Sequence, residues 1–248
     1  MFDSHFHLTD PRLLGCVANG VEIGANFEEL GNVFEFASQH KNVYCTAGVH
    51  PHYANDFVEN DFVNFVAANI ENKKFVAIGE CGLDYHRNER ACNARQIEVL
   101  LCHISVAHKY NKPLVVHSRA AAADTMEILS SNKDKLKNGV LIHCMSYTAD
   151  WAKELMLKLK GIPVYFAFGG HITYKENGFL ADTLRAIPRD RILIETDAPY
   201  LAPGAKRGEV NRPEYIEITA ARMAEILNLT TKEVDDLTTS NAAKFFFC

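Results

Sequence analysis

The chain opens with the stretch Met1-Phe-Asp-Ser-His5-Phe-His7-Leu8, in which two histidines are separated by a single residue. Side chains at positions i and i+2 of an extended segment point to the same face. A short strand ending in His5 and His7 would therefore direct two imidazoles toward one point, as a metal site requires. Two unrelated histidines on a strand edge would give the same local pattern. Evidence from the rest of the chain is therefore needed to distinguish a metal site from an unrelated pair.

Four later apolar segments also end in a residue type that binds metals, namely Glu80, His117, His143 and Asp197. Polar residues do terminate strands, and three or four such placements can arise by chance. Six placements out of six, all of metal-ligand type, indicate instead that the chain is a scaffold that gathers these side chains.

Eight short apolar runs recur along the sequence and are expected to form strands, at residues 2–7, 21–24, 43–49, 75–79, 114–116, 140–142, 164–168 and 192–194. Between them lie segments with helical spacing, such as Ile97, Leu100, Leu101, Ile104 and Ala107. The 248 residues thus divide into eight strand and helix units of about 31 residues each. This alternation predicts one domain, residues 1–248, folded as an α/β TIM-like (β/α)8 barrel.

An open doubly wound sheet is the competing architecture, because strand order cannot be read from sequence. Two further helices are expected to finish the chain, one over residues 214–227 and one opened by Thr230, whose hydroxyl can form a capping box with Glu233. In a parallel barrel the active site lies at the carboxyl ends of the strands. All six candidate ligands are expected there.

The composition indicates which class of protein the chain belongs to. Hydrophobic residues make up 48% of the chain and charged residues 23%, which is enough for a large core. The formal net charge of −5 argues against a broad basic face that grips a duplex. The seven cysteines include no Cys-x-x-Cys pair, so neither a disulfide framework nor a thiolate zinc site is indicated. With no leader or membrane-spanning run evident, we expect a soluble, cytoplasmic protein without membrane attachment or an obligate protein partner.

Four imidazoles and two carboxylates exceed what one tetrahedral ion uses. They suit two divalent cations that share a carboxylate bridge, and Glu80 is the natural bridge because its strand lies midway between the two histidine groups. The sequence does not distinguish Mg²⁺, Mn²⁺ and Zn²⁺ as the bound metal. We assign Asp197 as a ligand and as the general base, because it ends the last strand beside His5 and His7, where the barrel closes.

Taken together, these motifs resemble the signatures of the TatD family of metal-dependent deoxyribonucleases, and they follow in order along the whole chain. The motifs are Asp3-Ser-His-Phe-His7, Gly48-Val-His-Pro-His52, Ile78-Gly-Glu-Cys-Gly-Leu-Asp84-Tyr85, Val115-Val-His-Ser-Arg119, Leu141-Ile-His-Cys144, Glu195-Thr-Asp-Ala-Pro-Tyr-Leu-Ala-Pro203 and Arg207-Gly-x-x-Asn211-x-Pro213. The resemblance implies a barrel of the amidohydrolase type. It also implies one metal at His5, His7, Glu80 and Asp197, and a second metal at Glu80, His117 and His143.

Two positions depart from the family pattern. The family usually has an aromatic residue and a Ser-Gly turn after the histidine of the sixth strand, where this chain has Cys144 and Met145, and an aliphatic residue is commoner at Cys81. Neither departure replaces a ligand. Strand alternation is expected to turn both cysteines to the opposite face, into buried packing.

Several polar residues on the catalytic-face loops are candidates for substrate binding. His50 and His52 follow the third strand, and we favour substrate contacts over metal coordination for both. Arg119 stands two residues after His117, and Arg207 lies in the loop after the last strand, where either can contact a phosphate.

The charges favour an anionic substrate. Two divalent cations outweigh the charges of Glu80 and Asp197, and a two-metal site stabilises both the attacking and the leaving oxygen of phosphodiester hydrolysis. The acidic overall balance fits a single-stranded DNA end better than a wrapped duplex, which favours an exonuclease. The alternative is a hydrolase of the same fold acting on esters or amides, such as an aminoacyl-tRNA deacylase. A binding module without catalysis is disfavoured because no ligand is missing.

Overall fold

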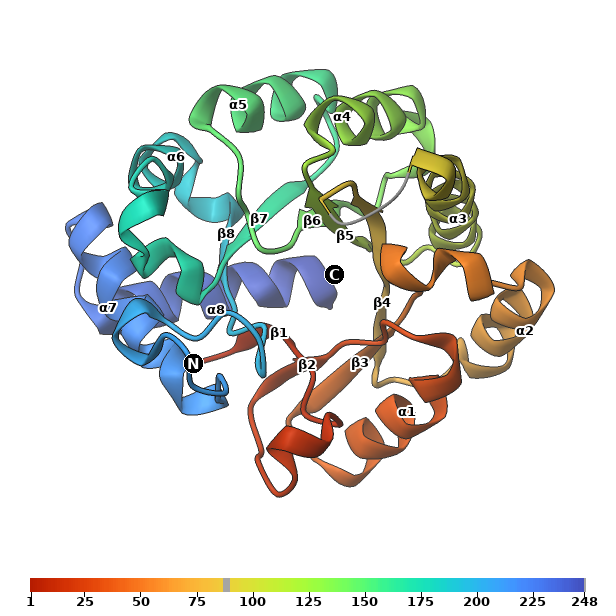
Figure 1. Cartoon of the computed structure of the whole chain (residues 1–248), viewed down its shortest axis with the longest axis horizontal. Coiled ribbons are helices and arrows are strands. Elements are labelled where there is room, and N and C mark those ends of the chain that lie inside the picture. Colours follow the sequence, from red (N-terminus) through yellow and green to blue (C-terminus); the bar gives the residue numbers. More distant parts are fainter. Residues whose placement is uncertain (87–89, 248) are drawn as a thin grey trace.

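The computed structural model describes residues 1–86 and 90–247. Its eight strands pair in parallel and in chain order, from the first to the eighth. Figure 1 shows them around a central axis with helices on the outside. The strands are β1 (Asp3–Phe6), β2 (Gly20–Glu22), β3 (Val43–Ala47), β4 (Phe75–Asp84), β5 (Leu114–Arg119), β6 (Val140–Ile142), β7 (Val164–Phe168) and β8 (Ile192–Ile194). The predicted (β/α)8 barrel is confirmed, and the doubly wound alternative is wrong because the strand order never reverses.

Eight α-helices are described, and they connect or follow the strands. They are α1 (Leu30–Gln39), α2 (Glu59–Asn69), α3 (Arg90–Lys109), α4 (Ala122–Ser131), α5 (Ala149–Lys158), α6 (Leu180–Ala186), α7 (Ile216–Leu227) and α8 (Thr231–Phe246). The capping box predicted between Thr230 and Glu233 opens α8. The expected helix over 214–227 begins slightly later, because a 3-10 turn at Pro213–Tyr215 precedes it. Among the described residues, no helix combines the length and apolar character needed to cross a bilayer.

The interior of the barrel is filled by every second residue of the strands. Val21, Val76, Val115, Leu141 and Leu193 are all buried and belong to one apolar cluster with Ala242, Phe245 and Phe246 of α8. Because Phe246 also contacts Phe2, which precedes β1, α8 closes the amino-terminal end of the barrel. Figure 1 shows α8 lying across the strands. The opposite end of the barrel is thereby left for the site.

The first and last strands meet at a seam. Parallel ladders, three of them with a register shift, join each strand to the next from β1 to β8, whereas no ladder between β1 and β8 is found in the part of the chain that is described. Individual hydrogen bonds close the seam instead. They run from Ser4 Oγ to the Ile194 carbonyl (2.8 Å), from Thr196 Oγ1 to Asp3 Oδ2 (2.6 Å), from the Asp197 amide to the His5 carbonyl (2.9 Å) and from the His7 amide to the Ala198 carbonyl (2.8 Å).

Two strands run further than predicted. β4 extends to Asp84 and β5 to Arg119, so Glu80 and His117 lie inside strands rather than at their ends. Glycine makes the extension possible: Gly82 has a φ of 144°, and a Cβ there would lie 1.9 Å from the His117 carbonyl oxygen. Only a residue without a side chain lets β4 run beside β5 at this height.

Candidate metal centre

A cavity of about 960 Å³ opens at the carboxyl ends of the strands. Loops that follow strands on all sides of the barrel contribute to its wall. Five of the six predicted ligands line the cavity, and the sixth, His5, is fully buried beside them. The structure therefore brings all six together.

Glu80 lies at the centre of the group. Its Oε2 atom is 3.4 Å from His5 Nε2, while its Oε1 atom is 3.0 Å from His117 Nδ1 and 3.1 Å from His143 Nε2. Each carboxylate oxygen thus faces a different set of imidazoles. This is the arrangement that a bridging carboxylate needs.

Asp197 completes the side of the group that contains His5 and His7. Its Oδ1 atom is 3.5 Å from His7 Nε2 and 3.7 Å from His5 Nε2. The residue has a φ of 58°, in the left-handed region that asparagine and aspartate tolerate better than most residues. This backbone conformation, three residues beyond β8, turns the carboxylate back toward β1.

The separations suit a shared cation. Two atoms bonded to one ion at about 2.0–2.2 Å and at 90–120° lie about 2.8–3.8 Å apart. The contacts of Glu80 and Asp197 with His5, His7, His117 and His143 span 3.0–3.7 Å, and most are longer than a charged hydrogen bond. Both ring nitrogens of His5 are buried without a hydrogen-bond partner among the described residues. A cation on this side of Glu80 would satisfy one of them, so the donor set fits metal ions.

The charges of the centre are strongly coupled. Burial alone raises the pKa of Glu80, but the surrounding histidines, His143 foremost, outweigh it and hold that pKa well below its usual value. Burial alone lowers the pKa of His143, but Glu195 and Glu80 outweigh it and hold the pKa well above the usual value. In the same way, contacts with Asp84 and Glu80 raise the pKa of His117 against the effect of burial. The carboxylates thus favour the protonated form of His117 and His143, and divalent cations would compete with those protons.

The candidate substrate contacts lie at different depths. His50 lies deepest in the cavity. Its Nε2 atom is 3.8 Å from Glu80 Oε1, and His50, Glu80 and His117 lie close enough together to bind one metal ion. Burial lowers the pKa of His50 to about 3, which leaves its imidazole neutral and able to bind a cation. His52 and Arg119 line the cavity wall.

Arg207 does not appear among the described residues that line the cavity. Its guanidinium pairs with Glu176 at 2.5 Å and lies 4.4 Å from the ring centre of Tyr174, which does line the cavity. Arg207 therefore stands behind the rim.

One cysteine behaves differently from the prediction. Cys81 is fully buried, as expected, but Cys144 lines the cavity and its Sγ atom is 3.6 Å from His171 Nδ1. The prediction for Cys144 is wrong because the residue lies beyond β6 with a φ of 47°, and strand alternation does not apply there. His171 in turn contacts the Met145 carbonyl through Nε2 at 2.8 Å.

Two buried carboxylates of the centre were not predicted. Asp84 Oδ2 is 3.2 Å from His117 Nε2, and Glu195 Oε1 is 3.2 Å from His143 Nδ1. A sequence signal for both existed, because the same-face spacing that singled out His5 and His7 also relates Glu195 to Asp197 and Glu80 to Asp84. Asp84 and Glu195 each contact the ring nitrogen that does not face Glu80, which places both carboxylates behind His117 and His143. Glu195 also lies close enough to His5 and His143 for these three side chains to hold an ion themselves.

A sequence profile described as TatD related DNase matches residues 2–247. The chain belongs to the TatD family. The TatD profile thus spans the barrel, the seam and all six predicted ligands.

Relatives of this TatD protein include two bacterial proteins named as uncharacterized metal-dependent hydrolases. YcfH of Escherichia coli is 37% identical over 212 residues, which cover 86% of this chain and 77% of YcfH. YabD of Bacillus subtilis is 31% identical over 258 residues, which cover 99% of this chain and 98% of YabD. The protein is accordingly a metal-dependent hydrolase of the TatD family.

Solved structures agree on the fold. The crystal structure of YJJV, a TatD homolog from Escherichia coli, matches with a TM-score of 0.90 at 22% identity and covers 100% of this chain and 98% of that one. A TatD family hydrolase from Entamoeba histolytica matches with a TM-score of 0.83 at 18% identity, covering 100% and 98%.

Proposed function

We propose that this TatD protein is a deoxyribonuclease that hydrolyses phosphodiester bonds at single-stranded DNA ends. The observation that carries the proposal is the geometry of Glu80, whose Oε2 atom faces His5 while its Oε1 atom faces His117 and His143. The name of the matching profile, TatD related DNase, points to the same reaction.

The residues divide into two cation sites that share Glu80. We assign His5, His7, Glu80 and Asp197 to the first cation, and Glu80, His117 and His143 to the second, from their contacts with the carboxylates of Glu80 and Asp197. His5, His7 and Glu80 lie within ligand reach of one another on the first side, and His50, Glu80 and His117 do so on the second. Divalent cations bound there would supply the positive charge that acidifies a water molecule and stabilises the phosphoryl oxygens. The imidazole-rich donor set favours Zn²⁺ or another transition metal over Mg²⁺.

Asp197 is proposed to hold the attacking water and to take its proton. Its carboxylate lies at the cavity surface, and contacts with His7 and His143 outweigh the effect of burial and keep its pKa below the usual value. The carboxylate is therefore ionised at neutral pH and able to accept a proton. Glu80 contributes by keeping both cation sites at fixed positions around the reacting phosphate.

Arg119 is proposed to bind the phosphate next to the cleaved bond. It is the one lysine or arginine among the described residues that line the cavity, its side chain is exposed, and no ion pair to it is found in the described part of the chain. An unpaired guanidinium can form two parallel hydrogen bonds with a phosphate. His50 and His52 are proposed to contact the substrate beside it, and Arg207 to contact a more distant nucleotide at the rim.

The experiment compares substrates for the same purified full-length protein. End-labelled single-stranded DNA, the matching duplex, an aminoacyl-tRNA and simple esters are each incubated with Mn²⁺ or Zn²⁺. The proposal expects stepwise shortening of the single strand, abolished by a chelator. Ester or aminoacyl cleavage without DNA shortening would assign the site to the alternative hydrolase instead.

A further inference from the structure

The two histidines beside Glu80 Oε1 each contact a second carboxylate through the opposite side of the ring. His117 directs Nδ1 to Glu80 (3.0 Å) and Nε2 to Asp84 (3.2 Å). In His143, Nε2 lies 3.1 Å from Glu80 Oε1 and Nδ1 lies 3.2 Å from Glu195 Oε1, the latter without the alignment of a hydrogen bond. The two rings therefore present different nitrogens to the same oxygen atom, and each has a carboxylate behind it.

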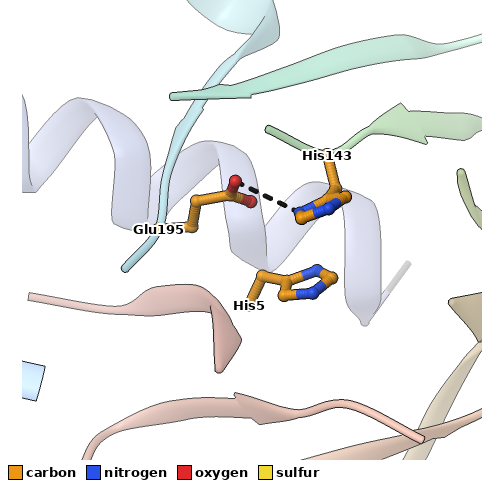
Figure 2. Close-up of side chains that lie close together, drawn as sticks. All are labelled: His5, His143 and Glu195. Carbon is orange, nitrogen blue, oxygen red and sulfur yellow. Dashed lines mark ion pairs between the residues drawn. The ribbon is translucent and has the colours of Figure 1, made fainter. Parts of the chain in front are cut away.

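The carboxylate of Glu195 is held in place independently of His143. Glu195 is fully buried, and its Oε1 atom accepts a hydrogen bond of 2.7 Å from the backbone amide of Cys144. Figure 2 shows the carboxylate directed at His143, with the ring of His5 close by. The rings of His5 and His143 are stacked, with centres 3.8 Å apart. His143 is thus confined between a fixed carboxylate and a second imidazole.

Asp84 is held just as firmly. It is buried, and the Gln96 side chain fixes its backbone. The Asp84 amide donates a hydrogen bond to Gln96 Oε1 (2.9 Å), and the Asp84 carbonyl accepts one from Gln96 Nε2 (3.2 Å). The Oδ1 atom accepts from the backbone amide of His86 at 2.9 Å, which leaves Oδ2 facing His117 and His52.

A neutral imidazole carries one N–H group and one lone pair, and an ionised carboxylate can only accept. The nitrogen that faces a carboxylate outside the metal site therefore keeps the proton, and the other nitrogen presents its lone pair. For His117 the lone pair falls on Nδ1, and for His143 on Nε2. Both lone pairs then point to the side of Glu80 Oε1.

We propose that Asp84 and Glu195 are positioning residues that set opposite tautomers of His117 and His143, so that both rings present a lone pair to the same cation. This inference rests on the second cation site proposed above. It adds that the affinity of this site depends on two carboxylates that do not bind the cation themselves.

The first test measures Zn²⁺ affinity by competition with a chromophoric chelator, using the full chain. E195L should weaken binding of the second Zn²⁺ about 10–100-fold and leave the first nearly unchanged. E195Q keeps a neutral acceptor and should lose less, and D84A should resemble E195L. The matched control is T238V, which removes another buried side-chain hydrogen bond, to the Val234 carbonyl at 2.8 Å on α8, and should leave both affinities unchanged.

The second test uses the wild-type protein, so it does not depend on the folding of variants. Nitrogen-15 NMR of the Zn²⁺-loaded protein, labelled at histidine, should show His143 protonated at Nδ1 and His117 protonated at Nε2, with H143Q and H117Q assigning the signals. The same tautomer at both residues would overturn the inference. So would unchanged Zn²⁺ affinity in E195L and D84A while H143Q and H117Q abolish the second site. If H143Q and H117Q also bind two Zn²⁺ normally, the proposed ligand set itself fails, and the inference with it.

Discussion

Replacement of Asp197 by asparagine separates the charge of this side chain from its shape. The φ of 58° at this position would strain most residues by about 1–2 kcal/mol, but asparagine adopts the left-handed region readily. The hydrogen bond from the backbone amide to the His5 carbonyl, at 2.9 Å, does not involve the side chain. D197N should therefore keep the fold and the seam, which D197A would not guarantee.

The expected loss is catalytic. Without an acceptor for the proton of the attacking water, kcat should fall at least about 100-fold, within the range of about 10²–10⁴ that general-base assistance provides. A 100-fold loss corresponds to about 2.7 kcal/mol of transition-state stabilisation. The apparent affinity for DNA should change less, because Arg119 and the cations remain.

The assay follows shortening of end-labelled single-stranded DNA while Mn²⁺ is raised to saturation. D182N, an exposed aspartate on α6, is the matched control and should retain wild-type turnover. If excess Mn²⁺ brings D197N back to nearly wild-type kcat, Asp197 is only a ligand and the assignment as general base is wrong.

Three further predictions follow from the same centre. E80A should no longer hold two cations, because both sites share this carboxylate; metal analysis that still finds two Mn²⁺ per chain would contradict the bridge. Cation affinity should fall as pH falls, beginning above pH 6.5, because the pKa values of His117 and His143 are raised and protons compete for the ligand nitrogens. Calorimetry in two buffers of different ionisation enthalpy should detect proton release on cation binding at pH 7. Binding without proton release would count against these ligands. R119Q should raise KM for DNA and flatten its salt dependence, whereas R207Q, whose guanidinium already pairs with Glu176, should do so less; equal effects would refute the separate roles.

The barrel and the convergence of the six candidate ligands could be predicted from the sequence because both depend on local patterns. The strand of His5 and His7, or of His143, is recognisable from a few neighbouring residues. The length of β4 could not be predicted from the sequence. Its extension depends on how closely Gly82 approaches the His117 carbonyl, which is a contact between two strands.

The layer behind the ligands was missed for a similar reason. A carboxylate such as Glu195 becomes important only when the amide of Cys144, 51 residues away, reaches it. The side-chain direction of Cys144 was mispredicted because a positive φ has no signature in a residue of that type. The pairing of Arg207 with Glu176 likewise joins two loops that the sequence does not relate.

The seam between β1 and β8 has a consequence for when activity can first arise. The proposed first cation site takes His5 and His7 from the first strand and the loop after it, and Asp197 from beyond β8. Individual hydrogen bonds hold the two sides together. In the proposed mechanism, a nascent chain still lacking β8 has the imidazoles of His5 and His7 but not the carboxylate of Asp197. Under the proposed function, no partial barrel formed during synthesis can therefore cut DNA, because the site is complete only when the two sides of the seam have met.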